Sequence, residues 1–459
     1  MKGNEQGAPS RQVRPRVENG QALSVSFTEQ RFGKPARHLA DLTGAERRQV
    51  VHELGYQAFR ADQLSRHYFE HLTTDPEHMS DIPAAQRFQL TEKMFPQLLT
   101  EVAHQVADGG ATVKSLWRLF DGAVIESVLM AYPDRTTLCI SAQAGCGMAC
   151  PFCATGQGGL VRNLTAAEIV EEVRLNMLAA RDGAVTAHAV AGNKRPHGGK
   201  VKVDQRGNAN PKAPADSRRI TNIVFMGMGE PLSNYKSVTE AIARITAPVP
   251  EGFGISARNI TVSTVGIVPG IHKLAELGLP LTLAVSLHAP DDDLRDDLIP
   301  INSSYNVSQL LDAARHYFVR TGRRVSIEYA LIKDMNDHVW RAELLAQELN
   351  SRGKGWAHVN PIPFNPTPGS IWTASTHRAQ EAFVHTLTAA GIPTTIRDTR
   401  GADIDGACGQ LAAKVIDPEH IAARAAKAQR AVRDRLLREK ENSREKENAS
   451  ASKPGNLRL

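Results

Sequence analysis

Cysteine is scarce in this sequence, with five residues among 459. So few thiols cannot form the disulfide framework that stabilises many secreted proteins. The sequence also lacks any apolar run of roughly 18 residues, the length that a membrane-spanning helix needs. Its N-terminal stretch, MKGNEQGAPSRQVRPRVENG, is polar and does not contain the apolar segment of a signal peptide. We therefore expect a cytoplasmic protein with reduced thiols and no membrane association.

A large excess of charge of one sign is absent as well. The chain has 55 Lys and Arg residues against 49 Asp and Glu residues, a net charge of +6. This modest basic excess is compatible with a polyanionic partner and equally with an ordinary enzyme. The hydrophobic share of 41% is enough for a globular core. No pattern in the sequence indicates an oligomer, so we expect a monomer.

The residue pattern divides the chain into four parts. Residues 1–38 are rich in Gly, Pro, Gln and Arg, and we expect them to be disordered. Residues 39–105 carry apolar residues at three- and four-residue spacing, which predicts a small helical domain. Residues 106–425 form the largest part, interrupted at 184–218 by a basic insertion that is either inert or a nucleic-acid contact. Residues 426–459 are expected to be a charged, largely disordered tail.

The largest part alternates apolar strand-like runs with helical patterns. Continuous apolar strands that alternate with helices are typical of parallel βα units. The sequence therefore predicts an α/β fold, a partial (βα)6 barrel, with functional residues at the C-terminal ends of its strands. Thr165 and Glu168 predict a capping box at the start of the first helix. The six predicted strands are residues 136–142, 220–226, 259–265, 281–289, 325–332 and 356–364.

Three of the five cysteines lie close together, just after the first predicted strand. Cys146, Cys150 and Cys153 have the spacing C-x3-C-x2-C in the stretch AGCGMACPFCATG. Three such thiolates can hold three corners of an iron–sulfur cube. The fourth iron would stay open to chelate the amino and carboxylate groups of S-adenosylmethionine (SAM). A structural zinc site is the alternative, but it needs four ligands, and the chain has no second cysteine pair.

Small and polar residues follow several of the other predicted strands. Gly229 allows the chain to turn where a Cβ atom would clash, and Glu230 supplies a carboxylate that could receive an ammonium group. Ribose hydroxyls, adenine or a methionine carboxylate could be bound at further strand ends, because one barrel mouth collects them all. A lone histidine among them is more often structural than functional. These further candidates are Ser263, Ser286, Leu287, His288 and Asn365.

The two remaining cysteines lie far apart in the sequence. Cys139 lies on the first predicted strand, where a small buried hydrophobic residue is the alternative to a functional thiol. Cys408 lies in the segment RDTRGADIDGACGQL, whose glycines and charged residues indicate a polar, flexible loop. Such a loop could present a reactive thiol.

Several segments together resemble a known family, the dual-specificity RNA adenine-C2 methyltransferases. These are radical SAM enzymes that act on 23S ribosomal RNA and on transfer RNA. The resemblance covers about residues 40–425, and only the basic insertion and both tails depart from it. The segments that carry it are LCISAQAGCGMACPFCATGQGG, FMGMGEP, VSLHAP, NPIPFNP and TRGADIDGACGQL.

The resemblance implies a fold, a reaction and partners. The fold would be a radical-SAM barrel with a helical RNA-binding accessory domain. The reaction would be methylation of carbon 2 of adenine in 23S rRNA and tRNA, with one [4Fe–4S] cluster and SAM as cofactors. Carbon 2 is electron-poor and cannot attack a sulfonium, which explains the need for a radical cofactor. A low-potential electron donor such as flavodoxin or ferredoxin would be required.

The resemblance also assigns roles to single residues. The three closely spaced cysteines match cluster ligands. Cys408 matches the cysteine that becomes S-methylated, and Cys139 matches the partner that then forms a disulfide with it. Glu126 matches a proton acceptor, although spacing alone does not select it, because an acidic residue on an edge strand is common. The positions that match SAM-binding residues are Gly229, Glu230, Ser263, Ser286, Leu287, His288 and Asn365.

Three alternatives remain open at this point. A related family methylates carbon 8 of the same adenine and confers antibiotic resistance, but the residues of the motifs and the N-terminal helical domain favour carbon 2. A non-catalytic RNA-binding protein with a structural metal would use the basic insertion and the tails. A radical enzyme acting on protein or on a small metabolite is the third, and the pair Cys139 and Cys408 argues against it.

Overall fold

The computed structural model describes residues 17–18, 21–22, 35–186, 218–367, 369–397, 409–416 and 418–451. Cys408, most of the predicted N-terminal extension, most of the basic insertion and the end of the tail lie outside these ranges. Strands β1 (Val17–Glu18) and β2 (Gln21–Ala22) form a short antiparallel pair. Over the described ranges, no helix is long and apolar enough to cross a membrane.

A nine-stranded sheet forms the centre of the molecule, in the order β13-β12-β11-β10-β9-β6-β5-β4-β3. The six strands from β6 to β13 in this order are parallel to one another. Each falls inside one of the six predicted runs or begins one residue before it, so the predicted α/β fold and partial (βα)6 barrel are confirmed. These strands are β6 (Arg135–Cys139), β9 (Asn222–Phe225), β10 (Ile260–Thr264), β11 (Thr282–Ser286), β12 (Val325–Leu331) and β13 (Ala357–Pro363).

Three antiparallel strands extend the sheet beyond β6. They are β3 (Leu99–Ala107), β4 (Thr112–Leu119) and β5 (Val124–Tyr132). Strand β3 begins inside the segment predicted as the helical domain, and between its two buried ends its residues are exposed or part-buried. Strand β5 pairs with β4 on one side and β6 on the other, so Glu126 lies on an interior strand and not on an edge strand.

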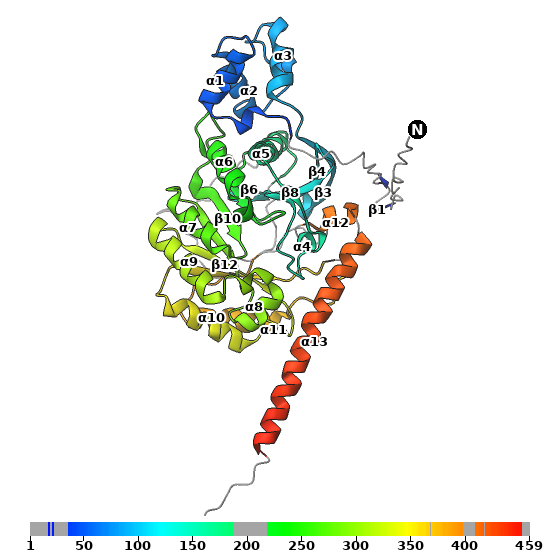
Figure 1. Cartoon of the computed structure of the whole chain (residues 1–459), viewed down its shortest axis with the longest axis vertical. Helices are drawn as coiled ribbons and strands as arrows, with labels where there is room; N and C mark the ends of the chain where they lie inside the picture. The colour runs from blue at the N-terminus through cyan, green and yellow to red at the C-terminus, as the bar shows by residue number, and fades with distance from the viewer. Residues whose placement is uncertain are drawn as a thin grey trace, which may run out of the picture.

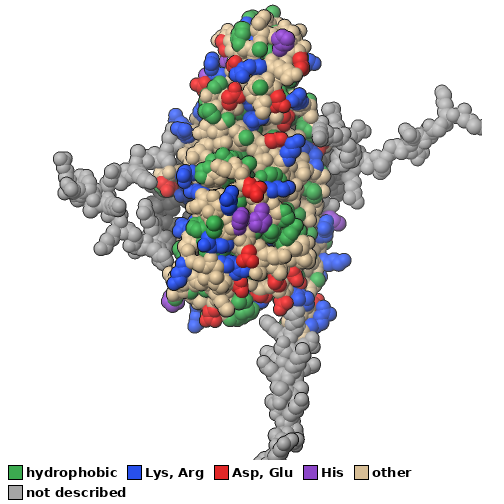
Figure 2. Space-filling model, turned by 60° about the vertical axis from the view of Figure 1, so that its left-hand side comes forward, with side chains coloured by type: hydrophobic (Ala, Val, Ile, Leu, Met, Phe, Trp, Pro, Cys, Tyr) green, Lys and Arg blue, Asp and Glu red, His purple; other side chains and the backbone are tan. Residues whose placement is uncertain are grey.

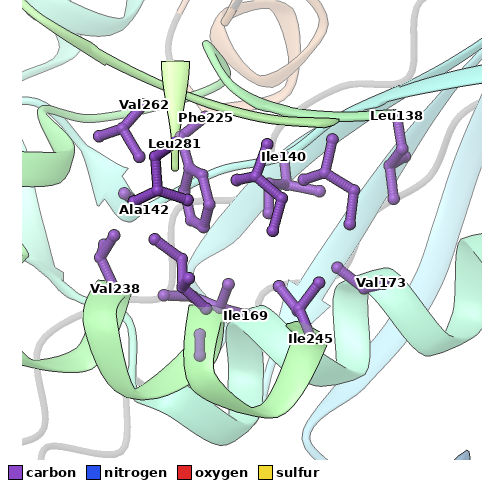
Figure 3. Packing of buried hydrophobic residues seen from close by; sticks show 14 of the residues in the cluster. Leu138, Ile140, Ala142, Ile169, Val173, Phe225, Val238, Ile245, Val262 and Leu281 are labelled. Atoms are coloured by element: carbon purple, nitrogen blue, oxygen red, sulfur yellow. The ribbon is translucent and has the colours of Figure 1, made fainter. Parts of the chain in front are cut away.

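Helices cover the outer face of the parallel strands (Figure 1). Side chains from the region of β6, from β9 and from β10 meet those of two helices in a dry layer, in which Ile169 and Val238 face Phe225 (Figure 3). The predicted capping box at the first helix is present, since Thr165 accepts a hydrogen bond from the Glu168 N–H group and Glu168 accepts one in return. The covering helices are α5 (Ala166–Arg181), α6 (Tyr235–Thr246), α7 (Val268–Glu276), α8 (Asp292–Leu298), α9 (Val307–Thr321), α10 (Val339–Ser351) and α11 (His377–Ala389).

A small group of helices lies at one end of the molecule (Figure 1). It consists of α1 (Gly44–Glu53), α2 (Arg60–Phe69) and α3 (Ala84–Met94). Tyr68 donates a hydrogen bond of 2.7 Å to Glu171 of α5, and Arg174 pairs with the same carboxylate. Because these groups are buried and mutually satisfied, they hold the helical group firmly against α5.

Two further helices follow Cys408 in the chain. Helix α12 (Gln410–Ile416) packs beside α4 (Ala154–Gly158), and α13 (Pro418–Ala451) runs from there along the body and projects past it (Figure 1). Ile421 of α13 packs with Ala154 and Ala413 in a small hydrophobic cluster. The C-terminal helices therefore lie against the segment that contains the three closely spaced cysteines.

Candidate active site

The three closely spaced cysteines lie on a loop that starts at the end of β6. Strands β7 (Gln143–Gly145) and β8 (Leu160–Asn163) form an antiparallel pair at the base of this loop. Cys146 follows β7, Cys150 lies in the turn and Cys153 is the N-cap residue of α4. We call residues 146–153 the cysteine loop. Its position at the C-terminal edge of the parallel strands is the position predicted for the functional site.

Burial dominates the electrostatics of these three thiols. It raises the pKa of Cys146 to about 12, with a smaller contribution from Cys153, and it raises the pKa of Cys150 and of Cys153 as well. Backbone N–H groups of Thr155 and Gly156 at the start of α4 oppose the rise at Cys153. The thiols are therefore neutral without a cation, and a bound metal centre would offset the burial and favour thiolates.

The donor set fits an iron–sulfur centre. Soft thiolate ligands favour iron–sulfur clusters or zinc. Within the described ranges, no three or more His, Cys, Asp or Glu side chains gather around one ion position. A cluster held by three thiolates places each on a different iron, so its ligands do not need to converge on one point.

Gly229 and Glu230 form a tight turn after β9 that packs on β7. Gly229 has a φ of +94°, and a Cβ atom there would come within 2.4 Å of the Gln143 side chain. The Glu230 N–H group donates a hydrogen bond of 2.8 Å to the Gln143 Oε1 atom. Only glycine allows this close approach, which places the carboxylate of Glu230 beside the cysteine loop.

The Glu230 side chain is buried and bonded only to uncharged groups in the contacts that the structure records. Its two oxygens accept hydrogen bonds from the backbone N–H groups of Leu232, at 3.0 Å, and Val265, at 2.8 Å. Burial raises its pKa to about 7, and these N–H groups oppose the rise. A carboxylate in such a place gains from an incoming ammonium group, because the cation restores the electrostatic stabilisation that burial removed.

The ends of β10 and β11 bring the next candidates to the same edge. Ser263 donates a hydrogen bond of 2.6 Å to the Phe225 carbonyl, so its hydroxyl links two strand ends. Ser286 is the last residue of β11, and Leu287 after it is fully buried. Asn365 lies two residues beyond β13 and is exposed. The structure thus places all of them at the C-terminal ends of the parallel strands.

His288 has a structural partner and also faces the cysteine loop. Its Nδ1 atom accepts a hydrogen bond of 2.9 Å from the Ala330 N–H group, which leaves the proton of the neutral ring on Nε2. Burial, and then the charge of Arg295, lower its pKa to about 3. Its ring meets the ring of Phe152 edge-on at 5.1 Å. Since Phe152 lies between Cys150 and Cys153, His288 supports the cysteine loop as a neutral side chain.

Sequence reasoning missed Arg295, which is completely buried under these strand ends. Its guanidinium donates to the Leu287 carbonyl at 3.0 Å and to the Val265 carbonyl at 2.6 Å. The segment DDDLRDD looks like a solvated helix face, so no signal in the sequence marks this residue. Arg295 therefore fixes two segments. One contains Val265, whose N–H group donates to Glu230, and the other is the Ser286–His288 turn.

Cys139 and Glu126 lie on one face of the sheet. Strand register pairs Lys114 with Val128 and Val128 with Cys139, so these three residues form a row across β4, β5 and β6. Glu126 is two residues before Val128 and therefore points to the same face. Burial raises the pKa of Cys139 to about 12, and the charge of Arg397 is the strongest opposing effect. Arg397 approaches the Met226 sulfur at 3.8 Å, next to the Cys139 thiol.

The carboxylate of Glu126 joins this face to the segment that follows Cys408. Its side chain pairs with Lys114 at 2.9 Å, and both side chains are almost fully buried. The Gly409 N–H group donates to it at 2.9 Å and the Ala412 N–H group at 2.6 Å. Gly409 also has a φ of +78°, and a Cβ atom there would overlap the Thr155 hydroxyl. The neighbour of Cys408 is thus held between α4 and Glu126.

This arrangement defines the class of protein: a radical SAM fold with a cysteine loop at the barrel mouth. A family described as the radical SAM superfamily matches residues 212–345. A solved radical SAM methyltransferase from Sphaerobacter thermophilus superposes with a TM-score of 0.71 at 40% identity, over 82% of this chain and 98% of that one. Enzymes of this superfamily generally use SAM and a [4Fe–4S] cluster.

Curated relatives define the family more narrowly. The chain is 57% identical over 401 residues to the probable dual-specificity RNA methyltransferase RlmN of Kocuria rhizophila, covering 87% of this chain and 98% of that one. It is 54% identical over 411 residues to the protein of the same name from Kineococcus radiotolerans, covering 90% and 97%. The chain belongs to the RlmN family of dual-specificity RNA methyltransferases, which confirms the resemblance found in the sequence.

Proposed function

We propose that this protein is a SAM-dependent methyltransferase that modifies carbon 2 of adenine in 23S rRNA and in tRNA. Membership of the RlmN family supports RNA methylation. The observation that carries the proposal on this chain is the contact of Glu126 with Gly409. It brings the residue after Cys408 to the face of the sheet on which Cys139 lies.

The proposal assigns the cofactors to the barrel mouth. Cys146, Cys150 and Cys153 would hold one [4Fe–4S] cluster, and Glu230 would receive the ammonium group of SAM. When bound, these cofactors supply the methyl group and the radical chemistry. Asn365 and the polar ends of β10 and β11 would line the rest of the SAM site, together with Gly229. A flavodoxin or ferredoxin would supply electrons to a monomeric enzyme.

The chain's own residues would then act in sequence. The Cys408 thiolate accepts a methyl group from SAM. That methyl group would then lose a hydrogen atom to the radical that the cofactors supply, and its carbon would bond to carbon 2 of the adenine, which would give up one electron to the redox cofactor and one proton. Glu126 is the candidate acceptor for the proton that carbon 2 loses. The Cys139 thiolate then attacks the Cys408 sulfur, which breaks the sulfur–carbon bond. The carbon takes up a proton and leaves as the methyl group of the base, and the two sulfurs form a disulfide.

The RNA would be held mainly by phosphate contacts from the helical group α1–α3 and from basic surfaces. On the face shown in Figure 2, Lys and Arg side chains are interspersed with Asp and Glu side chains over the body. No single basic track marks the RNA path on that face. The target adenine would leave its stack to reach the barrel mouth.

The decisive test uses anaerobic full-length protein with reconstituted cluster, reductant, SAM and 23S rRNA. Mass spectrometry of the digested RNA should show 2-methyladenosine, and repetition with tRNA tests the second substrate. If 8-methyladenosine appeared instead, the protein would have the activity of the related resistance family. If the protein bound RNA but neither iron nor SAM, a non-catalytic RNA-binding role would replace the proposal.

The disulfide step makes a separate prediction. Replacing Cys139 with Ala should trap the protein covalently on RNA, because no thiol remains to break the bond between Cys408 and the base. The adduct would migrate slowly in a denaturing gel and disappear on RNase digestion. The double variant Cys139→Ala/Cys408→Ala is the matched control and should form no adduct. Free, methylated RNA from the single variant would refute this step.

A further inference from the structure

Among the side chains of α13 that the structure describes, up to residue 438, one polar side chain is fully buried, that of Gln429. A buried amide needs specific hydrogen-bond partners. The Nε2 group of Gln429 donates a hydrogen bond of 3.0 Å to the Pro151 carbonyl. Its Oε1 atom accepts from the Ile371 N–H group at 2.8 Å and from the Ser370 hydroxyl at 3.1 Å.

One of these partners lies inside the cysteine loop. Pro151 directly follows Cys150 and comes two residues before Cys153, and Gln429 is 278 positions away from it in the sequence. The amide therefore ties the second half of the cysteine loop to α13 and to the segment after β13. Val432 and Leu436, one and two turns further along α13, pack in the same hydrophobic cluster as Met148 and Phe152.

A second glutamine amide holds the same turn from within. Gln157 of α4 donates to the Cys150 carbonyl at 2.9 Å. The two amides thus take the carbonyls of successive residues, Cys150 and Pro151, one from a local helix and one from the far end of the chain. A short loop that must present thiols at fixed positions benefits from such fixation, since ordering each free residue costs conformational entropy.

We propose that Gln429 is a positioning residue of the cluster site: its amide fixes the Pro151 carbonyl and thereby sets how Cys150 and Cys153 are presented to the cluster. The inference rests on the proposed role of these cysteines as cluster ligands. In this role α13 contributes to the active site. Removing the helix, or the Gln429 amide alone, would loosen the cysteine loop without altering any ligand.

The test compares Gln429→Met with Gln380→Met in the full-length chain. Methionine keeps the length and most of the volume of glutamine but makes none of the three hydrogen bonds. Gln380 on α11 makes a similar bond, donating to the Ser375 carbonyl at 2.8 Å, and touches no part of the cysteine loop, so it is the matched control. Each protein is reconstituted anaerobically with iron and sulfide, and loss of the cluster to a chelator is followed by absorbance.

We expect Gln429→Met to lose its cluster about tenfold faster than the wild type, because the three hydrogen bonds of a buried side chain are lost. The electron paramagnetic resonance signal of the reduced cluster should become heterogeneous, because the loop no longer holds one position. Gln380→Met should match the wild type in both measurements. Equal chelation rates and an unchanged signal in Gln429→Met would overturn the proposal.

Amide hydrogen exchange on the metal-free proteins separates a local effect from loss of folding. Exchange in Gln429→Met should rise in residues 146–153 and stay unchanged in strands β9–β12. A uniform rise across the sheet would show general destabilisation and would also overturn the proposal. If the wild type itself bound no iron, the cluster assignment under the proposed function would fail, whereas a local rise in exchange would still reveal the contact between Gln429 and the loop.

Discussion

Two buried carboxylates, those of Glu126 and Glu230, differ in the groups that surround them. Glu126, on β5, faces the ammonium group of Lys114 at 2.9 Å and receives two N–H groups at the start of α12. Glu230, after β9, receives only N–H groups and a hydroxyl in its recorded contacts, and burial raises its pKa to about 7. The first site already contains its cation, whereas the second is built to receive one. Glu126 therefore anchors a segment of the chain, and Glu230 is the better candidate for recognising a cationic ligand.

Removing the cation from the first site should have the largest effect. Lys114→Met leaves the Glu126 carboxylate buried without its counter-ion, a change that typically costs about 3–5 kcal/mol. We expect the free energy of unfolding of the metal-free protein to fall by this amount in urea titrations. The N-terminal end of α12 should also become accessible to proteases, because Glu126 would no longer hold Gly409 and Ala412.

The double variant Lys114→Met/Glu126→Gln is the control for this comparison. It removes both charges, so most of the lost stability should return, whereas the docking of α12 should not. If the double variant were less stable than Lys114→Met by the full cost of Glu126→Gln alone, the two residues would be energetically independent. That result would refute the ion pair as the anchor of α12.

Removing the charge of Glu230 should have a smaller effect. This effect should be larger on SAM binding than on folding stability. Glu230→Gln keeps the shape of the side chain and can still accept a hydrogen bond, but it cannot pair with an ammonium group. We expect SAM to bind about 10- to 100-fold more weakly, the usual range for one buried charge-assisted contact. Isothermal titration of the cluster-loaded protein measures this directly. Glu126→Gln should leave SAM affinity within about threefold of the wild type, and an equal loss in both variants would abolish the contrast.

The sequence predicted one half of the sheet much better than the other. Each parallel strand coincides with one of the short β-rich runs that helical patterns separate, so all six were found from the sequence. Strand β3 is mostly exposed or part-buried and follows a helical segment, so it was assigned to the helical domain. Strand β4 is almost entirely buried and was not among the predicted strands. The six parallel strands were marked by the helices between them, whereas within the described residues 99–132 no α-helix separates β3, β4 and β5.

The site was predicted where its residues are close in sequence and missed where they are not. The spacing of the three cysteines and the turn at Glu230 are local signals. Glu126 was found only through the family resemblance, and Lys114, Arg295 and Gln429 were not found at all. Each of these residues makes its main contact with a strand, loop or helix that is distant in the sequence, and no sequence pattern links the two. Such partners become visible only when the fold brings distant segments together.

The smallest predicted effect is a pH dependence of stability that comes from Glu230. Burial raises the pKa of Glu230 from its usual 4.5 to about 7. Between these values the folded protein holds a proton that the unfolded chain has released, so stability falls as pH rises through this interval and levels off above it.

Glu230→Gln cannot ionise, so its stability relative to the wild type should increase by roughly 1 kcal/mol per pH unit at most across the same interval. Urea unfolding of both metal-free proteins at several pH values from about 5 to about 8 measures the difference. Saturating SAM should remove it from the cluster-loaded wild type, because an ammonium group beside Glu230 lowers the pKa of the carboxyl towards its ordinary value. A difference between the two proteins that stays constant with pH would mean that Glu230 is ionised throughout, and the contrast with Glu126 would then rest on the ion pair alone.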